Sequence, residues 1–460
     1  VRLAEQSGWQ AGPDGTRLFI LTDGTAIGEA PEPVIFAEAD RRCLPNGTLE
    51  DWRHKVAALC AGNSRLTLFV SAAFAAPLLD PFEMPGGGFH LVGGSQSGKS
   101  TALFVAASVW GAPRPSDQVR SWNSTPNALG GIAAAANDLP IYLDELGEAA
   151  ARNVGAIVYS LANGIERSRM TRTLQVRAAK TWRTIPLSTG EVTPEQRMTE
   201  AKERTMSGQE VRLANIPADA GTGYGLFEAL HDMQPGELAD RLRENSRRCY
   251  GTAGRAWLER LVAALHTIDN GLERRWHTVR ADFETRMVPR DADGQVKSVA
   301  RRFALCAFAG EQAIDWQIVP WPATAAMQAA EQCFKTWLEA RGSIGSGEDA
   351  KTLAAVRGFI ERHDARFQTI YASGGMGDAP RDRAGFKRST EAGDTEWLIL
   401  PEVWRKEVCA GLDPLTAARA LRDAGHLDAP VRGAHLARKI RVTGMGQVRA
   451  YAVRPSVLDS

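Results

Sequence analysis

The sequence lacks paired cysteines, long apolar runs and any leader pattern. Its six cysteines are scattered along 460 residues with no C-x-x-C pair. This argues against a zinc site and a disulfide framework and fits a reducing compartment, so we expect a cytoplasmic protein. No apolar run is long enough to span a bilayer, and no basic-then-apolar signal peptide opens the chain, so we expect no membrane partner. The abrupt start at Val1-Arg-Leu-Ala predicts a piece of a longer protein.

The sequence also lacks an excess of either charge. It has 55 Lys and Arg against 54 Asp and Glu, a formal net charge of +1. There is no global basic field, so any contact with nucleic acid must come from a local patch. A composition of 44% hydrophobic and 24% charged residues is typical of a globular protein. The length is sufficient for two to four domains.

The most informative stretch fits the pattern G-x-x-x-x-G-K-[ST]. The apolar segment 87–92 before it predicts a strand, and the segment 101–110 after it predicts a helix. In that context the loop N–H groups and the start of the helix face a phosphate, Lys99 reaches the β- and γ-phosphates, and Ser100 offers a hydroxyl to Mg²⁺. A plain glycine turn would not need the complete pattern, so we predict an ATP and Mg²⁺ site. Its residues are Gly93, Gly94, Ser95, Gln96, Ser97, Gly98, Lys99, Ser100 and Thr101.

A second predicted strand supplies the carboxylates that ATP hydrolysis needs. The apolar segment 139–143 ends in Asp144 and Glu145. We predict that Asp144 faces the metal ion and that Glu145 polarises the attacking water. The alternative is an ordinary strand that ends at a solvated acidic turn. The position downstream of a phosphate loop favours the catalytic interpretation.

Residues 164–182 are unusually basic. Five cations crowd a segment of hairpin size with only Glu166 opposing them, namely Arg167, Arg169, Arg172, Arg177 and Lys180. We predict a hairpin that grips the phosphate backbone of DNA, with a solvated charged face as the alternative. The next strand, 184–191, ends in hydroxyls. Ser188 or Thr189 is predicted to contact the γ-phosphate or the attacking water as a sensor, unless the two form only a strand-ending turn.

The remaining regions follow different patterns. Residues 1 to about 47 predict short strands with a hairpin at Asp23-Gly24, and Thr48 is predicted to cap a helix that runs to Cys60. From 224 the pattern is helical, and a glycine-rich linker begins at 342. The expected helices are 226–231, 237–250, 254–269, 271–288, 296–314 and 324–341.

Beyond the linker, the pattern predicts a winged helix. Two helices at 401–409 and 413–424 precede two basic strands at 436–442 and 447–453. Such domains bind DNA with the second helix and the wing, or bind only protein, and we favour nucleic acid. The cations of the wing are Arg438, Lys439, Arg441 and Arg449.

Many short motifs, in order along the chain, resemble those of one family. They include Gly47-Thr-Leu-Glu-Asp-Trp52, Gly62-Asn-Ser-Arg-Leu66, the phosphate loop and Asn137-Asp-Leu-Pro-Ile-Tyr-Leu-Asp-Glu145, and they continue through 187–191, 208–212 and 301–304 to 309–311. With these motifs the chain looks like the phage and mobile-element helicase-like proteins described as containing domain of unknown function 927. The resemblance covers most of the chain, from about residue 8 to the end.

The resemblance implies an α/β fold with an AAA+ P-loop ATPase core, similar to minichromosome maintenance helicases, that assembles as a ring around DNA. We expect a hexamer. It also implies that the basic segment is a pore hairpin, that Arg212 is a finger for the neighbouring subunit's nucleotide, and that Arg301 is a lid sensor. Those helicases usually carry asparagine at the sensor, so the choice between Ser188 and Thr189 stays open. The implied organisation is a strand-rich region with a first helix (1–62), the core (63–223), a helical lid (224–342) and the winged helix (349–460).

These patterns predict a function with two alternatives. The favoured one is an ATP-driven ring helicase or translocase that replicates a mobile element or phage, with DNA in a central pore and a primase or other replication protein as a candidate partner. The first alternative is an AAA+ loader or remodeller that changes its assembly state on DNA without unwinding it. The second is a sequence-specific DNA-binding protein whose winged helix reads an origin while the ATPase assists.

Overall fold

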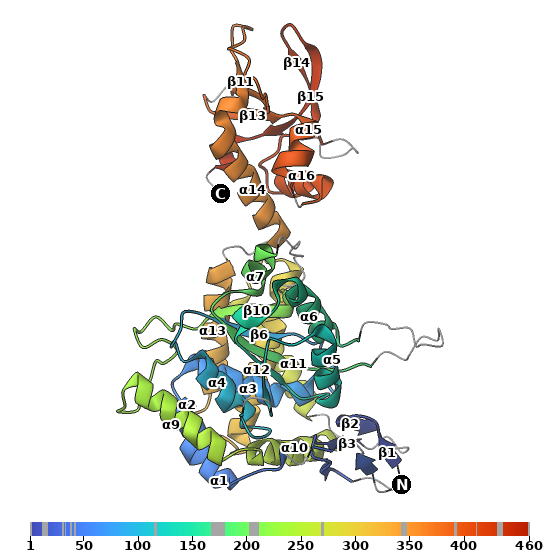
Figure 1. Cartoon of the computed structure of the whole chain (residues 1–460), viewed down its shortest axis with the longest axis vertical. Helices are drawn as coiled ribbons and strands as arrows, with labels where there is room; N and C mark the ends of the chain where they lie inside the picture. The colour runs from blue at the N-terminus through green and yellow to red at the C-terminus, as the bar shows by residue number, and fades with distance from the viewer. Residues whose placement is uncertain are drawn as a thin grey trace. The chain divides into compact units, whose positions relative to one another are not determined.

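The computed structural model divides the chain into two compact units, residues 1–344 and 345–460 (Figure 1). The described residues are 2–11, 17–29, 32, 34–36, 39–40, 43–114, 117–166, 180–201, 211–267, 271–341, 347–390, 393–410, 412–429 and 436–458. Each unit has its own hydrophobic core. The finer division of the first unit into strand-rich region, core and lid stays a prediction.

The N-terminal strands form two small sheets, as the sequence predicts. One is antiparallel in the order β2-β3-β4, and β1 pairs with β5 in parallel. The strands are β1 (Arg2–Ala4), β2 (Gly8–Ala11), β3 (Arg17–Ile20), β4 (Ala26–Ile27) and β5 (Val34–Phe36). Trp9 fixes this region to the rest of the unit, because its indole N–H donates to Pro77 O at 2.7 Å and its backbone N–H donates to the carboxylate of Asp138 at 3.0 Å.

Helical segments then lead to the central sheet. They are α1 (Leu49–Trp52), the π-helical turn η2 (Arg53–Ala57), α2 (Ala58–Cys60) and α3 (Ser64–Ala75). The Thr48 hydroxyl accepts a hydrogen bond from Asp51 N at 3.0 Å, which confirms the predicted cap. All twelve residues of α3 are buried, so α3 is a core helix rather than a surface helix.

The centre of the first unit is a parallel sheet of five strands in the order β10-β6-β9-β8-β7. The strands are β6 (Gly88–Val92), β7 (Val119–Ser121), β8 (Ile141–Asp144), β9 (Pro186–Gly190) and β10 (Leu213–Pro217). Alternate residues of β8 enter different cores: Tyr142 packs with α3 and α4, whereas Ile141 and Leu143 pack with α5 and α6. Helices therefore cover both faces, as expected of a parallel sheet. These helices are α4 (Lys99–Ala107), α5 (Pro126–Ala135), α6 (Ala151–Asn163) and α7 (Pro194–Glu200).

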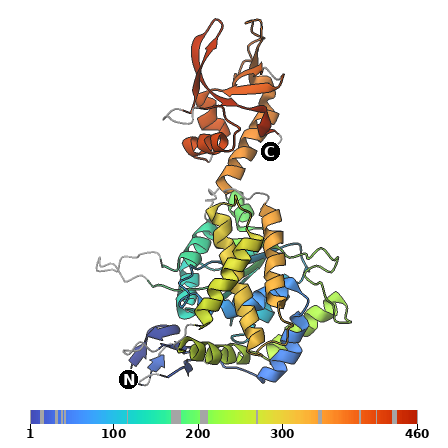
Figure 2. The same cartoon turned by 180° about the vertical axis from the view of Figure 1, so that it is seen from behind.

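A group of five helices completes the first unit. They are α9 (Pro235–Arg248), α10 (Thr252–Leu265), α11 (Gly271–Met287), α12 (Gly294–Asp315) and α13 (Ala325–Arg341), close to the predicted bounds. Figure 2 shows α11 to α13, in yellow and orange, side by side in front of the sheet. Phe303 of α12 meets Phe89 of β6 edge-on at 4.8 Å. The helix predicted at 226–231 is wrong: this segment is a loop, for reasons that its contacts give below.

The second unit contains a sheet in the order β11-β12-β13-β15-β14 with helices beside it. Its elements are α14 (Gly347–His363), β11 (Phe367–Ile370), β12 (Gly385–Ser389), β13 (Thr395–Ile399), α15 (Pro401–Val403), the π-helical turn η6 (Trp404–Val408), α16 (Pro414–Asp423), β14 (Arg438–Val442) and β15 (Gly446–Val453). The two predicted helices and the basic hairpin are present, but the sequence pattern missed β11 and β12. Among the described helices of both units, none combines the length and apolar character needed to cross a bilayer.

Candidate nucleotide site

The phosphate loop lies where the sequence places it, between β6 and α4. Gly98, with φ +89°, takes the left-handed conformation that precedes the first helical residue, Lys99. The Lys99 ammonium is held by Gly93 O at 2.8 Å and Gly94 O at 2.6 Å. Gly93 N donates to Gly190 O at 3.2 Å and so ties the start of the loop to the end of β9. The loop is therefore attached to the tip of the predicted sensor strand.

The acidic pair meets the loop at the carboxyl edge of the sheet. Asp144 is the last residue of β8, and its Oδ1 accepts a hydrogen bond from the Ser100 hydroxyl at 3.1 Å. Glu145 follows with φ +56°, an uncommon conformation for a non-glycine residue that often marks a functional turn. Its Oε1 accepts from Gly147 N at 3.2 Å. Both carboxylates thus lie at this edge, as predicted.

The donor set around Asp144 fits Mg²⁺. Hard oxygen ligands, few of them from protein, are what this ion takes when it bridges phosphates. The hydroxyls of Ser100 and Thr189 both donate to Asp144 Oδ1, which brings three oxygen-bearing side chains together beside the phosphate loop. Ser100 would hold the ion directly and Asp144 through water, and the ion would neutralise charge on the phosphates. No cluster of three His, Cys, Asp or Glu residues in the described ranges offers another metal site.

The structure places the two candidate sensor residues in different surroundings. Thr189 Oγ1 donates to Asp144 and accepts from Glu145 N at 3.4 Å. Ser188 points into the core, where its hydroxyl lies 2.8 Å from both His90 Nδ1 and Trp122 Nε1. Burial lowers the pKa of His90 to about 4, so the ring is neutral. Nε2–H then donates to Val192 O, Ser188 donates to Nδ1, and Trp122 donates to Ser188, which satisfies every member.

These contacts predict that substitutions at the two neighbouring residues change different quantities. Thr189→Ala is expected to lower kcat for ATP hydrolysis by about ten- to a hundredfold, because Asp144 loses a partner that orients it. Ser188→Ala is expected to cost about 1–3 kcal/mol of unfolding free energy for each buried group left unpaired, with a smaller effect on kcat. Steady-state phosphate release and urea unfolding measure the two quantities. Thr189→Ser, which keeps the hydroxyl, is the control, and equal kcat losses in both alanine variants would contradict this assignment.

A cleft of about 650 Å³ opens beside the phosphate loop. It is lined by the loop residues 95–101, by Glu145 and Glu191, by Tyr224 and Phe227 of the loop after β10, and by one face of α9 that includes Gly236, Ala239, Asp240 and Arg243. The sequence analysis missed Tyr224 and Arg243 as cleft residues. The glycine-rich run Gly221-Thr-Gly-Tyr-Gly225 was the available signal for the first. Arg243 carries no such signal because only the packing of α9 brings it there.

The two predicted nucleotide arginines lie away from this cleft. Arg212 directly precedes β10, donates to Asn163 Oδ1 at 3.1 Å and lies 4.6 Å from the centre of the Tyr159 ring. Since β10 runs parallel to β6, Arg212 is at the opposite end of the sheet from the phosphate loop, ~16 Å along a five-residue strand. Arg301 pairs with Glu284 at 2.8 Å and lines a separate cavity of about 430 Å³. Neither lines the cleft of its own chain.

Most of the predicted basic hairpin, including Arg167, Arg169, Arg172 and Arg177, lies outside the described residues. Its two ends are described and they pair: Ile165 bridges Thr181 in antiparallel fashion, and Glu166 N donates to Lys180 O at 2.9 Å. Lys180 itself is exposed. The two described ends of the predicted hairpin therefore lie side by side in the first unit.

The β14–β15 hairpin of the second unit, the predicted wing, carries a cationic face. Lys439 lies opposite Arg449 across the β14–β15 pair, and both are exposed together with Arg441. Ile440 and Val442 alternate with them and pack into the core. Arg438 is in an ion pair with Asp428. The face available to an anion thus consists of three of the four predicted wing cations.

The chain can now be compared with known proteins. Residues 1–181 match the family model described as domain of unknown function (DUF927). No curated protein matches the chain. Among solved structures, the chain is similar to one described as "SCCmec type IV Cch - active helicase", with a TM-score of 0.77 and 20% identity over 100% of this chain and 81% of that chain. The likeness at this identity shows a shared α/β fold, which agrees with the predicted fold class.

Proposed function

We propose that the protein is an ATP-dependent DNA helicase or translocase that acts as a ring in the replication of a mobile element or phage. One observation carries the ATPase part of the proposal. The phosphate loop, Ser100, Asp144, Thr189 and Glu145 converge at one edge of the sheet, beside a cleft of about 650 Å³. Lys99 would bind the β- and γ-phosphates, Asp144 and Ser100 would hold Mg²⁺, and Glu145 would polarise the attacking water.

Several features support an AAA+ core that works as an oligomer. The strand order places the phosphate loop after β6 and the acidic pair after β8, with the sensor strand β9 between them. We propose that Arg301, which lines a separate cavity, is a lid sensor. Arg212 lies at the opposite end of its own sheet from the phosphate loop, and we propose that it is a finger for the nucleotide of a neighbouring chain. Such a finger stabilises the charge that develops on the transferred phosphoryl group.

The contact with DNA is proposed for two basic surfaces. One is the segment 167–180, the proposed pore hairpin, whose flanking residues Ile165 and Thr181 form an antiparallel bridge. The other is the wing face of Lys439, Arg441 and Arg449, which the proposed winged helix would lay on the duplex. The similar solved structure is described as a helicase, and this description favours DNA over other polyanions.

The proposed pore hairpin predicts a specific loss of the stimulation of ATP hydrolysis by DNA. The double substitution Arg169→Ala and Arg172→Ala is expected to abolish the stimulation of ATP hydrolysis by DNA while basal hydrolysis continues, because the phosphate backbone loses its cations but the nucleotide site is intact. Phosphate release with and without single-stranded DNA measures this. Arg241→Ala with Arg248→Ala, which removes two exposed cations of α9, is the matched control. Stimulation that survives in the hairpin variant would refute the pore assignment.

A further inference from the structure

The loop of residues 219–228 is built against the phosphate loop. Leu226 N donates to Ser97 O at 2.9 Å, and Ala220 N donates to Gly225 O at 2.8 Å, which closes the loop on itself. Gly225 has φ +63°, and a Cβ there would lie 3.0 Å from Ser97 O. Only glycine allows this close approach without strain. The loop thus has a defined shape next to the phosphates, and these contacts explain why its last residues are not a helix.

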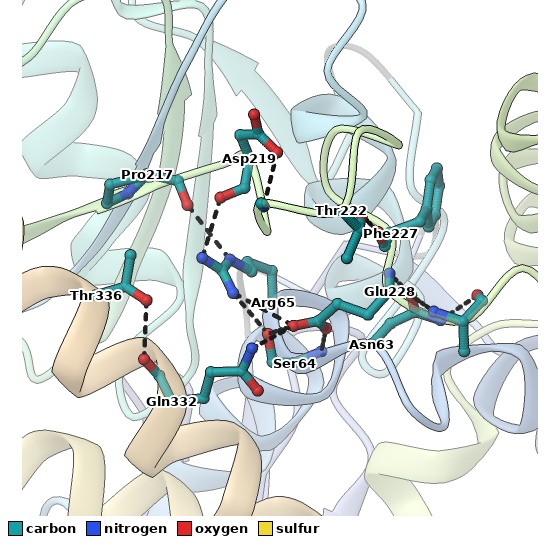
Figure 3. Close-up of polar contacts among 12 residues, drawn as sticks. Asn63, Ser64, Arg65, Pro217, Asp219, Thr222, Phe227, Glu228, Gln332 and Thr336 are labelled. Atoms are coloured by element: carbon teal, nitrogen blue, oxygen red, sulfur yellow. Dashed lines mark hydrogen bonds and ion pairs between the residues drawn. The ribbon is translucent and has the colours of Figure 1, made fainter.

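A buried polar cluster bonds the same loop to the core of the first unit (Figure 3). Arg65 of α3 has only 2% of its surface exposed. Its guanidinium donates to Pro217 O at 3.3 Å and to Asp219 O at 3.1 Å, and it lies 3.5 Å from the carboxylate of Glu228. Asn63 Oδ1 accepts from Glu228 N at 2.8 Å. Both ends of the loop are therefore fixed to the fully buried helix α3.

Of the two aromatic rings that the fixed loop contributes to the cleft lining, only that of Tyr224 is exposed. Tyr224 lines the cleft and is 47% exposed, whereas Phe227 is 2% exposed and packs under the loop. The cleft lining also includes one face of α9, with Gly236 and Ala239 beside Asp240 and Arg243, and a Cβ at Gly236 would meet open space. An exposed aromatic ring on a loop that is bonded to the phosphate loop is suited to stacking on a flat ligand group.

We propose that Tyr224 stacks on the base of the bound nucleoside triphosphate, with the base lying between this ring and the face of α9 that includes Gly236 and Ala239. The proposal rests on the proposed function, since it assumes that the phosphate loop binds the triphosphate. It adds the element that recognises the nucleoside. In this arrangement the Arg65 cluster positions the loop, and Tyr224 makes the contact.

The test separates the contribution of the base to binding from that of the phosphates. Isothermal titration in the presence of Mg²⁺ would compare ATP with inorganic tripolyphosphate on the full chain carrying Glu145→Gln, which prevents hydrolysis. Adding Tyr224→Ala is expected to weaken ATP binding about tenfold, the lower range of base stacking, and to leave tripolyphosphate binding unchanged. Tyr224→Phe, which keeps the ring, is expected to bind ATP like the parent.

Each other outcome has a defined meaning. Equal weakening of both ligands would show that Tyr224 is structural, and unchanged ATP binding in Tyr224→Ala would show that the base lies elsewhere. Either result overturns the stacking proposal and leaves the ATPase proposal standing. A parent that binds neither ATP nor tripolyphosphate would overturn the proposed function itself, and the stacking contact with it.

Discussion

Glu145→Gln is expected to lower the turnover of ATP about a hundred- to a thousandfold, because it removes the carboxylate proposed to activate the attacking water. The glutamine carbonyl can still accept from Gly147 N, so the strained turn after β8 is expected to keep its shape. Lys99, Ser100 and Asp144 are untouched, and ATP is therefore expected to bind with unchanged affinity. Steady-state phosphate release and titration with ATP measure the two quantities.

A matched control lies three residues further along the chain. Glu148 is exposed, accepts a hydrogen bond from the Ser121 hydroxyl at 2.5 Å, and does not line the cleft. Glu148→Gln is therefore expected to hydrolyse ATP at nearly the parent rate. If Glu145→Gln kept more than about a tenth of the parent turnover, the loss would be smaller than expected for a general base. Another residue would then have to activate the water.

Arg65→Ala is expected to lower the free energy of unfolding by about 3–5 kcal/mol, the range for breaking a buried ion pair from one side. The Glu228 side chain, which is 16% exposed, would lose its neighbouring cation, and the carbonyls of Pro217 and Asp219 would each lose a donor. Urea unfolding of the full chain, followed by tryptophan fluorescence, measures the change.

The exposed ion pair of Arg17 with Asp80 provides the comparison. Its atoms are 3.0 Å apart, and 44% of the Arg17 side chain is exposed. Solvent screens this pair, so Arg17→Ala is expected to cost about 0–1 kcal/mol. Similar losses in both variants would show that the Arg65 cluster contributes no more than a surface pair and does not hold the loop of residues 219–228.

Features encoded in one short stretch of sequence were predictable. The phosphate loop and the pair Asp144–Glu145 follow from local patterns, and the structure places them at the same edge of the sheet. The choice between Ser188 and Thr189 was not predictable. Consecutive side chains of a strand point to opposite faces of the sheet, and the sequence does not show which of the two points toward Asp144 and which into the core. His90 of β6 and Trp122, which directly follows β7, both bond to Ser188 and lie far from it in sequence.

Errors arose where long-range contacts override local preference. The segment 226–231 has helix-forming residues, but Leu226 bonds to the phosphate loop and Glu228 to Asn63 at the start of α3, so the chain forms a loop instead of a helix. The arginine in the apolar helix α3 was a sign of a buried ion pair, yet its partner lies more than 160 positions away. Strand β12 contains Lys387 and Arg388 and has no clear alternation, which is why the pattern did not predict it.

The central claim is that ATP hydrolysis at this site separates DNA strands. The most direct measurement is strand displacement on a forked duplex with ATP and Mg²⁺, with the parent protein beside Glu145→Gln. The account predicts displacement by the parent and none by the variant, and forks with a single tail would then give the polarity. ATP turnover by the parent without displacement on any fork would contradict it and would favour a loader or remodeller that changes its assembly state on DNA.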